Sequence, residues 1–256
     1  IMGMFCFQCQ EAAKNEGCTI KGVCGKTDDT ARMMDLLIYN IKGLSFYMNE
    51  AVKANIKEPE IDHFVLDALF STITNANFDK ASIKERVKKA VAYRKQIQQK
   101  LNAINYKIEN KIPVEAQFDY SSDEDLEKAA EKVGVLNTVD PDKRSLKELI
   151  TYGIKGMAAY SEHAMNLGYT DSSIYNFIYR AFSEITKEDI SVDTLVNLVL
   201  ECGKHGVDAM ALLDKANTST YGNPEITEVN IGVRNNPGIL ISGHDLKDIE
   251  ELLEQT

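Results

Sequence analysis

The chain has 256 residues, enough for one large domain or two ordinary ones with a substantial buried core. Its 29 basic and 39 acidic residues give a formal charge of −10, which opposes non-specific binding to nucleic acid or to anionic membrane surfaces. No stretch approaches the roughly 18 consecutive apolar residues of a membrane span, and no basic segment leads into an apolar signal core, so we expect a cytoplasmic protein without nucleic-acid or membrane partners.

The cysteines are distributed very unevenly along the chain. Cys6, Cys9, Cys18 and Cys24 follow the pattern C-x2-C-x8-C-x5-C, and only Cys202 lies outside this segment. In a long acidic chain without an export signal, clustered thiols bind metal more often than they form disulfides. The segment 4–26 is therefore predicted to hold one metal centre.

Two kinds of metal centre suit four thiolates: a [4Fe–4S] cluster and a structural zinc ion. Zinc ribbons usually bring two C-x2-C pairs together, whereas here one close pair is followed by wider steps. Gly17, Gly22 and Gly25 flank the later cysteines and would let backbone amides approach cluster sulfurs. The spacing favours iron–sulfur, with zinc as the main alternative and disulfides or unligated thiols as the third.

An internal repeat organises the middle of the chain. Apolar residues at helical spacing predict helices over residues 29–53, around 64–70, over 81–104 and over 191–215. Tyr39-x-Ile41-Lys42-Gly43 recurs as Tyr152-x-Ile154-Lys155-Gly156, 113 residues later, and residues 68–74 match 180–186 at an offset of 112. We therefore expect a mainly α fold in which a helical domain, 27–216, contains two repeated three-helix bundles, about 27–106 and 141–216.

The remaining residues, 217–256, have a different composition. A loop over 217–224 is followed by a possible strand at 228–233, a strand at 239–241, a turn, and a helix between Leu246 and Leu253. This order predicts the first strand–turn–helix unit of a truncated, Rossmann-like α/β domain, because a parallel sheet needs further strands and covering helices. A small α/β appendage on the helical body is the alternative.

Histidines provide weaker site candidates. His244 follows the strand at 239–241, where ligand groups often gather, although a solvated residue beside a helix cap is the commoner explanation. Cys202 and His205 share a helix face and could form half of a metal site, but a buried thiol beside an imidazole is more usual. His63 and His163 are expected at the surface.

Several segments resemble one known family over essentially the whole chain. The segments are Met4-Phe5-Cys6-Phe7-Gln8-Cys9-Gln10-Glu11, Cys18, Cys24-Gly25-Lys26, Thr72-Ile73-Thr74-Asn75-Ala76-Asn77, Tyr221-Gly222-Asn223-Pro224-Glu225-Ile226-Thr227 and Asn236-Pro237-Gly238-Ile239-Leu240-Ile241-Ser242-Gly243-His244-Asp245-Leu246. They are similar to those of the hybrid cluster proteins, also called hydroxylamine reductases or prismane proteins.

The resemblance implies two iron–sulfur centres. In that family the N-terminal cysteines bind a cubane cluster, which assigns a [4Fe–4S] cluster to Cys6, Cys9, Cys18 and Cys24. A second, hybrid Fe–S–O cluster has one histidine, two glutamate and several cysteine ligands, and His244 matches the histidine. The other ligands would lie in two further α/β domains, so no complete catalytic site is expected within residues 1–256.

The resemblance also implies an activity. Members reduce hydroxylamine to ammonia and water with two electrons and two protons, and nitric oxide reduction under nitrosative stress in anaerobes is a second proposed task. The N-terminal cluster would relay electrons from a redox donor protein or an NADH-dependent reductase to the hybrid cluster. This chain alone is expected to be inactive; the alternative is a stand-alone iron–sulfur electron-transfer module without reductase activity.

Overall fold

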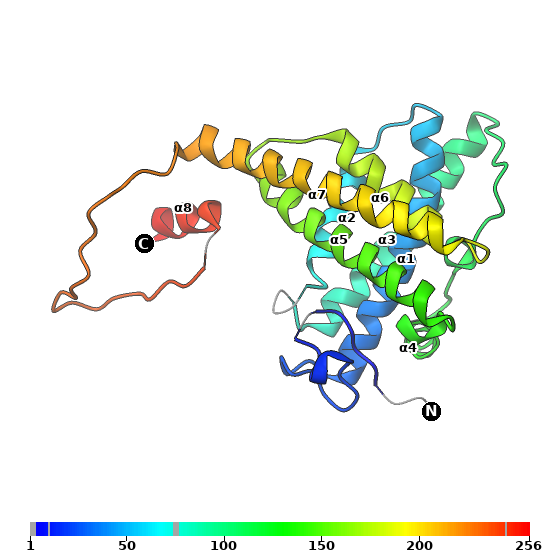
Figure 1. Cartoon of the computed structure of the whole chain (residues 1–256), viewed down its shortest axis with the longest axis horizontal. Helices are drawn as coiled ribbons and strands as arrows, with labels where there is room; N and C mark the ends of the chain where they lie inside the picture. Colours follow the sequence, from blue (N-terminus) through cyan, green and yellow to red (C-terminus); the bar gives the residue numbers. More distant parts are fainter. Residues whose placement is uncertain (1–3, 10, 74–76, 244) are drawn as a thin grey trace.

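The computed structural model describes residues 4–9, 11–73, 77–243 and 245–256, and in these ranges the protein is mainly helical, as predicted (Figure 1). The elements in chain order are η1 (Ala13–Asn15), α1 (Asp28–Lys53), α2 (Pro59–Phe70), α3 (Lys80–Ala103), η2 (Val114–Gln117), α4 (Asp123–Ala130), η3 (Val135–Asn137), α5 (Pro141–Asn166), α6 (Ser172–Ile185), α7 (Val192–Tyr221) and α8 (Leu246–Gln255). None of the described helices is both long and apolar enough to traverse a lipid bilayer.

Side-chain caps set where most helices begin. The Asp140 carboxylate accepts hydrogen bonds from the backbone N–H groups of Asp142 and Lys143, and Pro141 takes the first position of α5, where a missing N–H costs nothing. Ser191 caps α7 by accepting from the Thr194 N–H at 3.1 Å.

The helix α7 is longer at its C-terminal end than the sequence suggested. Residues 217–221 were predicted as loop because they are polar and rich in threonine and serine, yet they continue the helix. The Thr218 hydroxyl donates to the Asp214 carbonyl at 2.7 Å, which satisfies a polar side chain on the helix itself. The helix ends at Gly222, whose φ of 88° is left-handed backbone that glycine adopts without strain.

The two repeats interlock around one core. The helices α1 and α5 each have 26 residues and begin at Asp28 and Pro141, 113 residues apart. The helix α1 packs against α3 and α6, and α5 packs in the corresponding way against α7 and α2; Figure 1 shows α7 running alongside α5. One continuous cluster of buried apolar side chains spans α1 to α7. The three-helix units therefore share their core instead of closing separately.

The predicted strands at residues 228–233 and 239–241 do not form in the described part of the chain. Residues 222–243 have no regular secondary structure, and Figure 1 shows them as a wide loop beside the helical body. Ile226, Val233 and Leu240 are almost fully exposed. A strand is stabilised by a neighbouring strand, and the described residues offer none. The helix predicted after this segment is present as α8.

The repeat provides a matched test of packing. A Cβ atom on Gly43 of α1 would lie 2.2 Å from the carbonyl oxygen of Glu115. A Cβ atom on Gly156, the equivalent glycine of α5, would meet no such neighbouring atom within 4 Å. Gly43→Ala must displace the backbone of η2, so we expect it to lower the free energy of unfolding by about 1–3 kcal/mol. Gly156→Ala should raise it by up to about 1 kcal/mol through helix propensity. Urea denaturation of both variants measures the contrast, and equal effects would contradict this packing.

Candidate metal centre

Backbone pairing brings two of the four cysteines together. The N–H of Cys6 donates to the carbonyl of Cys18, and the N–H of Cys18 donates to the carbonyl of Cys6, each at 2.9 Å. Residues paired directly in an antiparallel arrangement direct their side chains to the same side. Both are buried and pack with Met4 and with Ala31 of α1. The two thiols therefore share one face of the N-terminal segment.

The other two cysteines, Cys9 and Cys24, are half-buried in tight loops. The Gly22 N–H donates to the Lys26 carbonyl at 2.8 Å, which curls the chain around Cys24. A Cβ atom on Gly22 would lie only 3.1 Å from the Cys24 sulfur, so glycine lets the backbone pass the thiol closely. The Ala13 N–H is directed at the Cys18 sulfur at 3.4 Å. Backbone N–H groups near thiolate ligands tune the reduction potential of a cluster.

The environment of Cys6 favours a neutral thiol unless a metal binds. Burial raises the pKa of Cys6 to about 11, and the Gln8 backbone N–H and the Lys26 charge only partly oppose this effect. Metal ligands are thiolates, so binding must displace the Cys6 proton. Metal binding at Cys6 would therefore be coupled to the loss of this proton.

Two side chains of α5 hold the loop between Cys6 and Cys9. The Tyr152 hydroxyl donates to the Phe7 carbonyl at 2.6 Å, and the two rings meet edge to face. The Lys155 ammonium donates to the Gln8 backbone carbonyl at 3.0 Å, to the Gln8 side-chain oxygen at 2.9 Å, and to the Thr72 carbonyl at 3.3 Å. Lys155 therefore joins the cysteine loop to α5 and to the end of α2.

A carboxyl group lies on the other side of the Gln8 side chain. The Gln8 amide nitrogen donates to the buried Asp35 carboxylate of α1. Burial, with a contribution from the Glu148 charge, raises the pKa of Asp35 to about 7. Burial, with a contribution from the Lys26 charge, lowers the pKa of Lys155 to about 8. Gln8 thus links two buried titratable groups beside the cysteines.

The donor chemistry of the segment suits an iron–sulfur cluster. All four cysteines are free thiols. Across the described ranges, no three His, Cys, Asp or Glu side chains come close enough together to hold a single metal ion. A four-iron cluster is much larger than one ion, and its thiolates stand correspondingly farther apart. The segment thus offers four thiols as candidate ligands, with glycines and a backbone N–H close to two of the sulfurs.

The other predicted candidates lie elsewhere. His244 falls outside the described residues. Cys202 is buried on α7 with its sulfur against Gly153, and His205 stacks on Phe177 with ring centroids 4.4 Å apart, so neither faces the N-terminal cysteines. His63 is exposed. His163 is half-buried against Phe70 and pairs with Asp245, the cap of α8. Cys202 is thus a buried thiol and His63 lies at the surface, as expected, whereas His163, also expected at the surface, is only half-buried.

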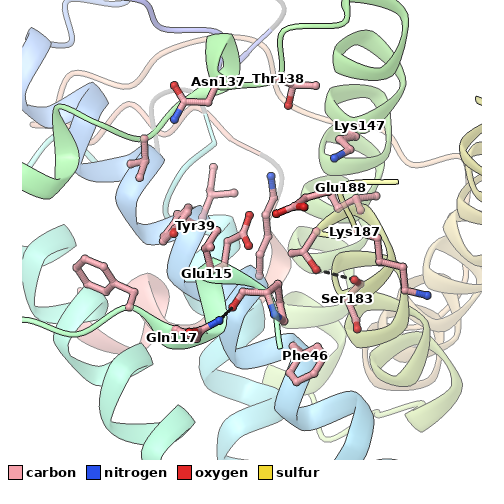
Figure 2. A pocket seen from close by; sticks show the side chains of 18 of the residues that line it. Tyr39, Phe46, Glu115, Gln117, Asn137, Thr138, Lys147, Ser183, Lys187 and Glu188 are labelled. Carbon is pink, nitrogen blue, oxygen red and sulfur yellow. Dashed lines mark hydrogen bonds between the residues drawn. The ribbon is translucent and has the colours of Figure 1, made fainter. Parts of the chain in front are cut away.

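A cavity of about 1280 Å³ adjoins the cysteine loop, and its lining includes Gln8 and Asp35. Figure 2 shows Tyr39 and Glu115 on one wall and Lys147 and Glu188 on the opposite wall. Burial raises the pKa of Glu115, and burial together with the Lys42 charge lowers the pKa of Lys147. The walls of the cavity thus carry both acidic and basic side chains, and the cavity extends to Gln8.

Comparison with known sequences identifies the family. The sequence profile of the Prismane/CO dehydrogenase family matches residues 4–256. The chain belongs to this family. Membership implies an iron–sulfur centre, in agreement with the donor set described above.

Curated relatives of the prismane family match the whole chain. They include the hydroxylamine reductases of Thermoanaerobacter pseudethanolicus (54% identical over 255 residues, 46% of that protein), Caldanaerobacter subterraneus subsp. tengcongensis (54% over 256 residues, 47%) and Clostridium novyi (57% over 255 residues, 46%). The chain spans about half the length of the curated relatives it matches. The similarity thus relates it to the N-terminal portion of these oxidoreductases.

Sequence reasoning did not recognise the groups that hold the cysteine loop. Tyr152 and Lys155 were identified only as members of the repeated Tyr-x-Ile-Lys-Gly motif, and neither was selected as a contact of the cysteines. Lys26 and Thr72 fall in segments that carry the resemblance to the prismane family, but nothing in their spacing pointed to buried contacts. The one available signal for a buried contact was the lysine of the repeated motif, which lies among the apolar positions of its helix.

Removing the Tyr152 hydroxyl should loosen the cysteine loop. Tyr152→Phe leaves the Phe7 carbonyl without its donor, and we expect the local opening free energy of residues 4–26 to fall by about 1–3 kcal/mol. Hydrogen exchange measures this loss. Tyr160→Phe is the control, because Tyr160 lies on the same helix, is 43% exposed and should change protection by less than about 0.5 kcal/mol. Unchanged protection in Tyr152→Phe would show that the hydrogen bond does not hold the loop.

Proposed function

We propose that this chain is the N-terminal, cluster-bearing part of a hydroxylamine reductase. The observation that carries the proposal is identity of 54–57% along the whole chain to hydroxylamine reductases of three bacteria. The arrangement of four free thiols on one segment, held against both repeats, supports it. The proposed reaction takes up two electrons and two protons per hydroxylamine and releases one ammonia and one water.

Cys6, Cys9, Cys18 and Cys24 are the proposed ligands of a [4Fe–4S] cluster. When bound, such a cluster supplies one-electron transfer without binding the substrate. Burial of Cys6 and Cys18 excludes water from one side, and the Ala13 N–H directs its hydrogen toward the Cys18 sulfur. Tyr152 and Lys155 hold the loop that carries Cys6 and Cys9. Contacts with α5, and not the cysteine segment alone, therefore place these two ligands.

Chemistry on the nitrogen substrate is proposed to occur outside the residues of this chain. The curated relatives are about twice as long, and the hybrid Fe–S–O cluster expected for this family takes His244 together with glutamate and cysteine ligands from the other half. The cluster of this chain would relay electrons there from a redox protein or an NADH-dependent reductase in the cytoplasm. Hydroxylamine is the proposed substrate, and nitric oxide is a second candidate of the same chemical class.

The segment 222–256 is proposed to become the beginning of an α/β domain when further strands are available. Most of its isoleucine, valine and leucine side chains are exposed, and Ile226, Ile231 and Val233 are each at least 95% exposed. Burying such side chains between a sheet and its helices would release water from apolar surface and satisfy the backbone by pairing. The helix α8 already has the amphipathic character of a helix that covers a sheet.

Metal and sulfide content per chain tests the proposed cluster. After anaerobic purification we expect about four irons and four acid-labile sulfides per chain, with little zinc. Cys18→Ala removes one proposed ligand and should lose most of this iron, whereas Cys202→Ala should keep it, because Cys202 lies on α7 away from the segment. Stoichiometric zinc without sulfide, or equal iron in both variants, would refute the assignment.

Enzymatic activity distinguishes part of a reductase from a stand-alone electron-transfer module. With a reduced viologen dye as donor, the isolated chain should form no ammonia from hydroxylamine above the rate without protein. A chimera that joins this chain to the remaining half of the Clostridium novyi relative should restore ammonia formation to within about tenfold of that relative. Turnover by the isolated chain would show that it contains a complete site. An inactive chimera that holds both clusters would favour the electron-transfer module.

A further inference from the structure

Two lysine side chains are buried beside the cysteine segment without an ion-pair partner. Lys26 and Lys155 are each only 3% exposed. Among the residues that the structure describes, no carboxylate oxygen lies within 4.0 Å of either ammonium nitrogen. Removing an ammonium from water is expensive unless an opposite charge compensates it, so buried lysines are normally paired.

The groups that contact these lysines are neutral. Lys155 donates to two backbone carbonyls and one amide oxygen, as described above. Lys26 donates to the thioether sulfur of Met34 at 2.9 Å and lies 5.7 Å from the centre of the Phe78 ring. A thioether is a weak acceptor, and one aromatic face compensates only part of the lost hydration. Hydrogen bonds satisfy much of Lys155, but neither positive charge is neutralised.

The nearest buried carboxyl group does not balance both charges. Asp35 is joined to Lys155 by hydrogen bonds through the Gln8 side chain, and the charges of Asp35 and Glu148 act on Lys155 from beyond ion-pair distance. The raised pKa of Asp35, about 7, means that this carboxyl is incompletely ionised at neutral pH. Both ammonium groups lie next to the cysteines: Lys155 donates to Gln8, between Cys6 and Cys9, and Lys26 follows Cys24 by two residues. Negative charge at the cysteines would therefore compensate both ammonium groups.

Four thiolates around an oxidised [4Fe–4S] core carry a net charge of about −2, which matches two ammonium groups. We infer that Lys26 and Lys155 are the buried counter-charges of the four-cysteine centre. Lys155 is also a positioning residue, and its positive charge raises the reduction potential of the cluster. The inference rests on the proposed function, because it requires a cluster at these cysteines. The sign follows from Coulomb's law: a fixed buried cation stabilises the state that has gained an electron.

The repeat supports a specific role for Lys155. Its counterpart Lys42 occupies the same position of the motif on α1, but Lys42 is only half-buried and faces the cavity near Glu115. Only the repeat that contacts the cysteine loop buries its lysine completely. The difference in burial thus follows the cysteine segment and is not a general property of the motif.

Redox titration of the anaerobic holoprotein, followed by electron paramagnetic resonance, tests the inference. In Lys155→Met we expect the ratio of reduced to oxidised cluster at a fixed potential to fall by about tenfold, equivalent to about 59 mV toward more negative values for one electron. Lys155→Arg keeps the charge and should stay close to wild type. Lys204→Gln removes an exposed lysine from α7 and should also leave the potential unchanged.

The outcomes separate this inference from the proposed function. Wild-type protein without iron and sulfide would refute the proposed cluster itself. A wild-type potential in a Lys155→Met variant that keeps its iron, or an equal shift in Lys204→Gln, would overturn the role of Lys155 alone. If Lys155→Met does not fold, Lys155→Gln and Lys26→Met provide the same titration.

Thermal unfolding gives a second readout. Removing the cluster with a chelator leaves both ammonium groups unpaired in wild type but only one in Lys155→Met. The drop in melting temperature on cluster removal should therefore be smaller in the variant, and an equal drop would contradict the counter-charge role.

Discussion

The buried ammonium of Lys155 constrains where the cysteine loop and the end of α2 lie relative to α5. An ammonium without water must find acceptors, and those it finds belong to the cysteine loop at Gln8 and to the end of α2 at Thr72. The Tyr152 hydroxyl, one helical turn away, does the same for the Phe7 carbonyl. Because both donors lie on α5, the cysteine segment is held by the second repeat although it precedes the first in sequence.

Duplication explains the scaffold, and divergence explains the site. Equivalent helices pack in equivalent ways, so α1 with α6 mirrors α5 with α2. On α1 the repeated motif contacts the connecting segment, where Tyr39 meets Phe118 and Gly43 lies against η2. On α5 the same motif positions contact the cysteine loop. Equivalent helix surfaces thus contact two different segments, and only one of these segments contains the four clustered cysteines.

Apolar side chains are buried unevenly along this chain of the prismane family. The helical body is well packed, whereas residues 222–245 expose several large apolar side chains. Apolar surface of this kind usually marks a missing contact. The curated relatives are about twice as long as this chain, and the covering of these residues by additional strands and helices is part of the proposal above.

Local patterns in the sequence determined much of this protein. Apolar periodicity located the long helices, the Tyr-x-Ile-Lys-Gly repeat revealed the duplication, and the crowding of Cys6, Cys9, Cys18 and Cys24 indicated the candidate centre. These features depend on residues close together in the chain, which is why spacing alone discloses them. The extension of α7 to Tyr221 was missed because a polar segment was expected to form a loop, whereas Thr218 satisfies its hydroxyl group on the helix itself.

Only the tertiary structure decided which distant groups meet. Nothing in the spacing places Lys155 against Gln8, or pairs the backbone of Cys6 with that of Cys18, because such contacts depend on how α5 and α2 pack around the shared core. The strands expected at residues 228–233 and 239–241 do not form in the described part of the chain, because they too depend on distant partners. A helix satisfies its own backbone, but a strand depends on a neighbour that the local sequence cannot supply.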